Sequence, residues 1–144
     1  MGKLTQRLTD PARSGVYRAP GSAEIEDAVH GTTLDLAPVD LGGATDKESL
    51  LEQLAPALGF PAWFGGNWDA LEDCLCDLAW RAGEGHVLVL QGYQDLPPDD
   101  LGVLLDVLAA SAAYWAGRSL PFFAVFIDPE RRLALPELFR RKSE

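Results

Sequence analysis

Two continuous apolar runs constrain the fold of this chain more than any other feature of its sequence. Residues 87–90 and 122–127 contain no polar side chain, and such runs are typical of strands that are covered on both faces, which are usually parallel. Between the runs, Pro97, Pro98 and Asp99 are expected to begin a long helix that Gly117 closes. A strand, a helix and a strand in this order predict an α/β layer with a parallel sheet.

The chain before these runs adds a strand and a helix to the prediction. Residues 31–36 have the β-branched content of a strand. Residues 45–48 match a capping box and precede three leucines at helical spacing, in a helix that Pro56 is expected to kink or end. With 144 residues, 47% of them hydrophobic, the chain fits a single α/β domain. We expect a small, mainly parallel three-stranded sheet with helices packed on it.

Segments at both ends differ in composition from the central region. Residues 1–30 are expected to form a partly ordered N-terminal extension with a short strand at residues 15–18, and residues 31–128 to form the domain itself. Residues 129–144 are expected to form a basic C-terminal tail, whose cations are Arg131, Arg132, Arg140, Arg141 and Lys142.

An aromatic and glycine turn runs into a short acidic helix at residues 61–78, and this is the most informative motif for function. Asn67 has a side chain suited to a helix N-cap, so the helix is predicted to start at Trp68. Gly65 and Gly66 permit positive φ and leave backbone N–H groups accessible to another molecule. The motif therefore predicts a recognition loop followed by a helix.

Helical spacing separates an apolar stripe from a charged face in this helix. The stripe, expected to face the core, comprises Leu71, Cys74, Leu75 and Leu78, and the other side carries Asp69, Glu72, Asp73 and Cys76. Asp73 and Asp77 form a like-charge pair, which destabilises a helix by roughly 0.2–0.5 kcal/mol. A solvated face is the plainest interpretation, but tryptophans at positions 63, 68 and 80 surround the carboxylates, and such aromatics are typical anchors of binding interfaces.

The formal charge of the chain is concentrated in the same region. Between Asp46 and Asp106 there are 12 acidic residues and 2 basic ones, which accounts for the whole net charge of −10, and the remainder of the chain is neutral. A directional negative field attracts a basic partner and speeds its association. Nucleic acid and anionic membranes are poor partners for this surface, so neither is expected to bind.

The sequence lacks the patterns of common catalytic and metal sites. No phosphate-binding glycine motif or nucleophile elbow is present, and His30 and His86 do not have zinc-ligand spacing, so no cofactor, metal or catalytic residue is predicted. Cys74 and Cys76 point to different helix faces and are expected to be free thiols. Two enzymatic alternatives remain, an acid/base pair of Asp69 and Asp73, and a Cys76 nucleophile that the neighbouring carboxylates disfavour.

Compartment and assembly follow only indirectly from the sequence. The first seven residues lack the apolar segment of a secretory signal, so we expect a cytoplasmic protein. The oligomeric state is left open, and a monomer is the simplest expectation.

The segment from Trp63 to Leu75 resembles the loop and second helix of barstar-like ribonuclease inhibitors. The shared pattern is aromatic-aromatic-Gly-x-Asn-x-Asp-Ala-Leu-x-Asp-Cys-Leu, and a weaker similarity extends from about Thr33 to Asp128. The resemblance implies a barstar-like domain at residues 31–128 with a three-stranded parallel sheet. It also implies a protein that binds a basic, secreted, guanyl-specific ribonuclease of the barnase type inside the producing cell.

Site residues follow from the same resemblance, position by position. In such inhibitors the loop and helix plug the ribonuclease active site, and a helix carboxylate takes the place of the substrate phosphate. By motif position that carboxylate belongs to Asp73, with Asp69 as a second one, while Trp63 and Asn67 match loop positions that touch the enzyme. The full predicted partner-binding surface comprises Trp63, Gly65, Asn67, Trp68, Asp69, Glu72, Asp73, Cys76 and Asp77.

Two departures from the family pattern keep a second function open. Glu72 stands where the family often has an aromatic residue, and residues 109–113 lack the acidic side chains that some members add to the interface. A module with the barstar fold that binds another basic protein is therefore the alternative to a ribonuclease inhibitor.

Overall fold

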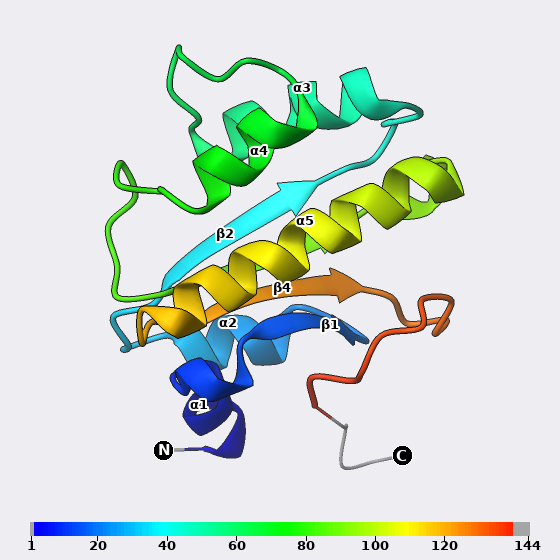
Figure 1. The fold of residues 1–144 in the computed structure, drawn as a ribbon. Coiled ribbons are helices and arrows are strands. Elements are labelled where there is room, and N and C mark those ends of the chain that lie inside the picture. Colours follow the sequence, from blue (N-terminus) through cyan, green and yellow to red (C-terminus); the bar gives the residue numbers. More distant parts are fainter. Residues whose placement is uncertain (1, 140–144) are drawn as a thin grey trace.

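Four parallel strands form the centre of the structure, a computed structural model that describes residues 2–139 (Figure 1). The strands are β1 (Gly15–Ala19), β2 (Asp35–Asp40), β3 (His86–Gln91) and β4 (Phe122–Ile127), in the spatial order β1-β4-β3-β2. The α-helices are α1 (Lys3–Leu8), α2 (Ala23–Val29), α3 (Lys47–Leu58), α4 (Trp68–Leu75) and α5 (Pro98–Gly117). Short 3₁₀ turns lie at Pro11–Arg13 and Tyr93–Asp95.

The sheet corrects the prediction of three strands. It has four, because β1 from the predicted extension pairs in parallel with β4 along its whole length. The strand predicted at residues 31–36 lies four residues later, as β2, and contains Pro38. Proline has no backbone N–H and so is found in edge strands rather than central ones. β2 is an edge strand, so Pro38 is compatible with its position. Both strands predicted from apolar runs are confirmed at the centre of the sheet.

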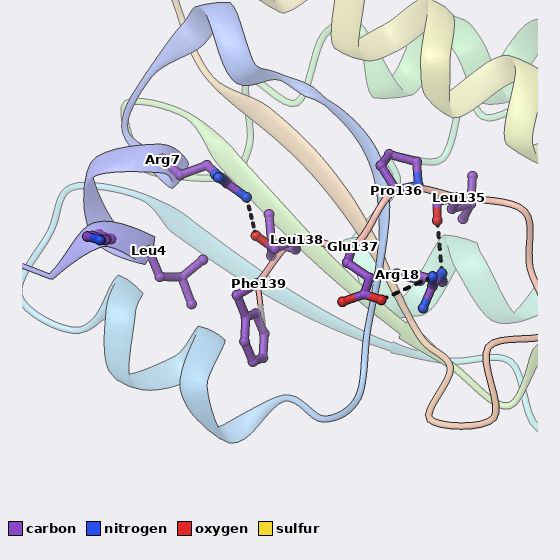
Figure 2. Close-up of a pocket in the computed structure, with 9 residues that line it drawn as sticks. Leu4, Arg7, Arg18, Leu135, Pro136, Glu137, Leu138 and Phe139 are labelled. Atoms are coloured by element: carbon purple, nitrogen blue, oxygen red, sulfur yellow. Dashed lines mark hydrogen bonds and ion pairs between the residues drawn. The ribbon is translucent and has the colours of Figure 1, made fainter. Parts of the chain in front are cut away.

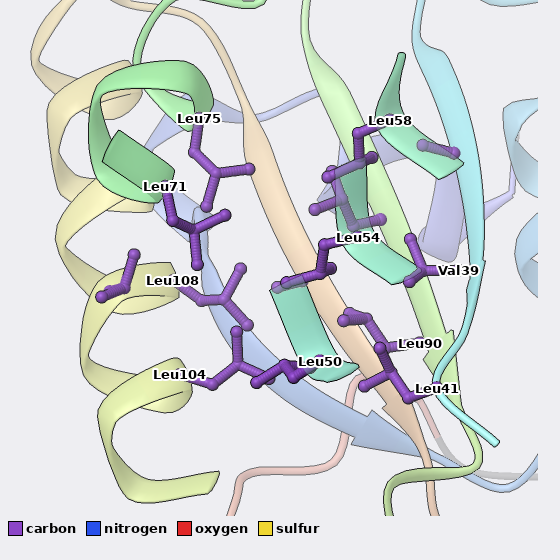
Figure 3. Packing of buried hydrophobic residues seen from close by; sticks show 14 of the residues in the cluster. Val39, Leu41, Leu50, Leu54, Leu58, Leu71, Leu75, Leu90, Leu104 and Leu108 are labelled. Carbon is purple, nitrogen blue, oxygen red and sulfur yellow. The ribbon is translucent and has the colours of Figure 1, made fainter. Parts of the chain in front are cut away.

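The helices cover both faces of the sheet. On one face, α3, α4 and α5 enclose the larger core, and Figure 3 shows their leucines pointing toward Val39 and Leu90 of the sheet. These leucines are Leu50, Leu54 and Leu58 of α3, Leu71 and Leu75 of α4, and Leu104 and Leu108 of α5. On the other face, α1 and α2 bury Leu8 and Ile25 against Val87 and Phe123. Successive side chains of β3 and β4 therefore point to opposite faces of the sheet and pack into two cores, as the apolar runs predict.

The C-terminal segment lies along the outer edge of β1 (Figure 2). The backbone N–H of Leu138 donates to the Arg18 carbonyl at 2.9 Å, and that of Arg18 donates to the Pro136 carbonyl at 2.9 Å. Leu138 is fully buried in the second core. The described part of the predicted tail thus covers a strand edge, whereas Arg140, Arg141 and Lys142 lie outside the described residues. The domain boundaries predicted at residues 31 and 128 stay predictions.

Three helix ends differ from the sequence-based expectation. Asp46 caps α3 in a reciprocal pair with Ser49, so the capping box is one residue later than predicted. Pro56 does not end α3, which continues to Leu58 and stops at Gly59 in the left-handed conformation. Gly117 is the last residue of α5, and the left-handed position after it is occupied by Ser119, with φ 61°. The side chains of Asp46 and Ser49 and the left-handed Gly59 therefore set the two ends of α3.

Helix α5 is long and apolar enough, by length and composition alone, to cross a membrane. Its buried residues, however, pack against the sheet and α4: Leu104, Val107, Leu108, Ser111, Ala112 and Trp115. One buried stripe is the pattern of an amphipathic helix that packs on the core of a globular domain.

A partly buried ion pair ties the chain after α4 to the start of β2. Arg81 Nε donates to Asp35 Oδ2 at 2.6 Å, and His86 Nδ1 lies 2.9 Å from the same oxygen. Burial alone would raise the pKa of Asp35, but the hydrogen bonds and charges of Arg81 and His86 outweigh it and hold that pKa below its usual value. The ionised carboxylate is thus the form that the fold stabilises.

Replacing Asp35 by asparagine should destabilise the protein at pH 7 by about 1–3 kcal/mol, because Arg81 loses its carboxylate. The contribution of Asp35 is present above its unfolded pKa of about 3.9 and is lost as the pH falls through its lower folded pKa. Urea unfolding of D35N and wild type at neutral pH and below pH ~3 measures the destabilisation and its loss in acid. The exposed Asp27→Asn variant is the control, and an equal D35N deficit at both pH values contradicts this interpretation.

Candidate partner-binding surface

The loop between α3 and α4 ends in a side-chain cap. Asn67 Oδ1 accepts a hydrogen bond from the Ala70 N–H at 2.7 Å, so the predicted N-cap and the start of the helix at Trp68 are confirmed. Gly66 has φ +70°, a conformation that residues with a Cβ rarely adopt. Gly65, Gly66 and Asn67 are all exposed. The turn therefore presents backbone and the cap residue to solvent.

An aromatic cluster supports the loop from beneath. The ring centroids of Phe60 and Phe64 are 4.9 Å apart, and Trp80 packs edge-on against Phe60 at 6.1 Å and Trp63 at 6.2 Å. Trp80 Nε1 donates to the Leu58 carbonyl at 2.9 Å, which fixes the cluster to the end of α3. Trp63 is nevertheless 57% exposed. It is a supported aromatic side chain that a partner can cover.

The apolar stripe of α4 is buried as predicted. Leu71, Cys74, Leu75 and Leu78 are at most 1% exposed. The helix ends at Leu75, and Leu78 reaches the core from the following turn with a left-handed backbone, φ 51°. Burial of this stripe turns the opposite side of the helix toward solvent.

The carboxylates of that side are exposed and unpaired. Asp69, Glu72, Asp73 and Asp77 are all solvent-exposed. In the part of the chain that the structure describes, no ion pair within 4.0 Å joins any of them to a basic group. Among the described residues, the structure therefore holds an acidic face whose carboxylates form no ion pair, and the loop before it exposes Trp63.

Two predicted residues offer less surface than the others. Trp68 is half-buried and packs against the larger core, and Cys76 is half-buried beside α5. All nine predicted residues lie on the loop, on α4 or in the turn after it. That they contact a partner stays a prediction.

Both cysteines are free thiols, as predicted. Burial raises the pKa of the Cys74 thiol to about 11, and Asp73 and Asp77 add to the rise. Burial also raises the pKa of Cys76, with Glu72 and Asp73 contributing, although a hydrogen bond with Ser111 opposes the shift. Thiolates are thus disfavoured here, and neither cysteine has the electropositive surroundings of a reactive one.

Sequence analysis missed two grooves that adjoin this surface. One, of about 620 Å³, lies between α3 and the loop and is lined by Glu48, Glu52, Phe64 and Gly66 among others. The other, of about 450 Å³, lies between α4 and the end of α5 and is lined by Asp73, Asp77, Tyr114 and Arg118 among others. The exposed pair of Tyr114, in the last turn of α5, and Arg118, the residue that follows the helix, was a signal for the second groove.

A further pocket, of about 580 Å³, lies against α1 and the C-terminal segment (Figure 2). It contains three cations, but Arg7 donates to the Leu138 carbonyl, and Arg18 donates to the Leu135 carbonyl and pairs with Glu137. Two of the cations therefore hold the C-terminal segment in place. Within residues 2–139, no group of three or more potential metal ligands comes together.

Comparison with known proteins identifies one family. The Barstar (barnase inhibitor) family matches residues 34–127, a range that includes the loop, α4 and the strands β2 to β4. No curated protein sequence matches the chain.

Two solved structures share the fold at low identity. They are Cdc6p from Pyrobaculum aerophilum (TM-score 0.52, 14% identity, 87% of this chain covered) and the ORC2 protein of Aeropyrum pernix in ADPNP–ADP complexes (TM-score 0.50, 16% identity, 82% covered). This chain spans 36% of the length of each. At such identity the likeness concerns only the arrangement of sheet and helices.

Both thiols should alkylate slowly in the folded protein. At pH ~8 we expect iodoacetamide to react with Cys74 and Cys76 at least about tenfold more slowly than in urea-unfolded protein, because a raised pKa and burial reduce the reactive thiolate. Mass spectrometry of the two peptides over time measures the rates. Equal rates in folded and unfolded protein would show that the thiols are accessible and reactive.

Proposed function

We propose a function on the premise that the family match supplies: this chain belongs to the barstar family. It inhibits a guanyl-specific ribonuclease of the barnase type by inserting the loop and α4 into the active site of the enzyme. The observation that carries the proposal is the set of exposed carboxylates on α4, none of them in an ion pair with a described residue, which follows a loop with an exposed Trp63. A ribonuclease that binds RNA needs a basic cleft, and this face is its electrostatic complement.

Individual residues have distinct roles in this proposal. Asp73, the sixth of the eight residues of α4, lies on its exposed side and takes the place of a substrate phosphate among basic groups of the enzyme. Asp69, one helical turn earlier, is the second carboxylate. Trp63 provides an aromatic anchor, and Asn67 keeps the loop joined to the first turn of the helix. No residue is assigned a catalytic role.

Rigid support explains how a short helix could bind tightly. Trp115 Nε1 donates to the Leu75 carbonyl at 2.8 Å at the end of α4, and Asn67 caps its beginning. Like charges spaced along an isolated helix would destabilise it, but here the buried stripe and both end contacts hold the helix in place. The carboxylates are therefore positioned before a partner arrives, which reduces the entropy cost of binding.

The proposal includes a cellular setting and excludes two partner classes. The inhibitor acts inside the cell that makes the ribonuclease, where it keeps the enzyme inactive until export. A net charge of −10 is unfavourable for binding nucleic acid or an anionic membrane, so neither is a proposed partner. A monomer is sufficient, because the loop and α4 come from one chain.

A barstar-fold module for another basic protein is the second candidate. The observation that favours it is Glu72, an exposed carboxylate at a position where the family often has an aromatic residue. Capture of proteins from a cell lysate on the immobilised chain, with and without the Asp73→Ala change, distinguishes the candidates. A ribonuclease lost with the mutation supports the first, and a different basic protein lost with it supports the second.

The variant Asp73→Ala should weaken inhibition by about 3 kcal/mol, or at least ~100-fold, because it leaves basic groups of the enzyme buried without a partner. Inhibition constants against a panel of guanyl-specific ribonucleases measure the effect. Asp27→Ala, on the exposed side of α2, is the matched control. If the wild-type protein inhibits no member of the panel, or if D73A inhibits as well as wild type, the proposed mechanism is wrong.

Salt should act mainly on the association rate. Raising the ionic strength from ~0.05 to ~0.5 M shortens the Debye length and screens the approach of opposite charges, while contacts in the closed interface are screened less. Stopped-flow and surface-binding kinetics should show association slowing by about tenfold or more and dissociation changing much less. A complex whose salt dependence lies entirely in dissociation would argue against steering by the acidic face.

A further inference from the structure

The groove between α4 and the end of α5 combines opposite charges in one place. Asp73 and Asp77 line it from the side of α4, and Tyr114 and Arg118 line it from the side of α5. Its geometry is set from beneath by the hydrogen bond from Trp115 to the Leu75 carbonyl, which joins the two helix ends. Asp73 belongs to both this groove and the proposed inhibitory surface, so a partner seated on α4 also covers the groove.

Arg118 is the one cation among the described residues that line this groove. Its guanidinium carbon lies 5.6 Å from the ring centroid of Tyr114, which is 43% exposed. Within the described part of the chain, no carboxylate is within 4.0 Å of Arg118, although two line the same groove. The guanidinium therefore lies over an aromatic ring at cation–π distance, and no described carboxylate holds its N–H groups.

A partner that covers this groove removes the charge of Arg118 from water, so the partner must compensate that charge. A uniformly basic partner would bring its own positive groups against Arg118, which is unfavourable, and a neutral apolar surface would remove the guanidinium from water and offer it no new hydrogen-bond acceptor. A carboxylate solves both problems, because the planar guanidinium donates two parallel hydrogen bonds to it. The Tyr114 ring attracts the guanidinium to this side of the groove through a cation–π interaction.

We propose that the groove is a specificity site that selects a partner with a carboxylate at the rim of its basic cleft, where that carboxylate pairs with Arg118. The inference rests on the proposed function, because it assumes that a basic protein occupies the neighbouring α4 surface. The acidic face then attracts many basic proteins, and Arg118 distinguishes among them by requiring one acidic side chain beside the cleft.

The test compares two charge reversals of equal size. Arg118→Glu and Lys3→Glu each make the chain more negative by two charges, and Lys3 is exposed on α1, which covers the other face of the sheet. Dissociation constants are measured for a guanyl-specific ribonuclease that the wild-type protein inhibits. K3E should bind as tightly as wild type or more tightly, whereas R118E should bind at least about tenfold more weakly despite the same added charge.

The neutral variant Arg118→Gln keeps the test valid if the charge reversal disturbs the end of α5, and thermal unfolding of each variant checks the fold. R118Q should also bind more weakly than wild type. Binding of R118E or R118Q as tight as that of K3E would overturn the inference. If D73A loses inhibition while R118E does not, only the specificity site is refuted. A wild-type protein that inhibits no ribonuclease refutes both the proposed function and this inference.

Discussion

Burial of one side of α4 is the constraint on which the rest of the surface depends. Leu71, Leu75 and Leu78 pack into the larger core, so the carboxylates between them face solvent. The four apolar residues of the stripe, fully withdrawn from water, stabilise the helix by several kcal/mol, whereas each like-charge pair costs roughly 0.2–0.5 kcal/mol. Packing therefore outweighs the repulsion, and the fold displays a charge arrangement that an isolated peptide would resist.

Supports from three different elements give that surface its shape. The aromatic cluster fixes the loop to the end of α3 through Trp80, Asn67 caps α4, and Trp115 of α5 binds its last turn. The parallel sheet brings these elements to one face, since the chain segments β2 to β3 and β3 to β4 each cross on that side (Figure 1). The proposed recognition surface is thus supported by the core and by side-chain hydrogen bonds, and Trp63 on its loop and Tyr114 on α5 are exposed.

The parts of the fold that sequence predicts well are those with strong local patterns. The apolar runs at residues 87–90 and 122–127, the stripe of α4 and the Asn67 cap are all confirmed, because each is determined by neighbours in the sequence. The places of β1 and of the segment around Leu138 in the sheet were harder to predict. They depend on pairing with each other and with β4, across more than 100 residues of sequence. The groove at Arg118 was missed for the same reason, because its two sides come from helices that only the tertiary fold brings together.

Direct competition at the ribonuclease active site is the most direct test of the central claim that α4 occupies the place of a substrate phosphate. A guanosine 3′-phosphate ligand bound to the enzyme can be followed by fluorescence or NMR while this protein is added. The account predicts mutually exclusive binding. The nucleotide should be displaced in proportion to the complex formed, and the apparent affinity of the protein for the enzyme should fall as the nucleotide concentration is raised. A ternary complex, in which nucleotide and protein bind the enzyme together without loss of affinity, would contradict it.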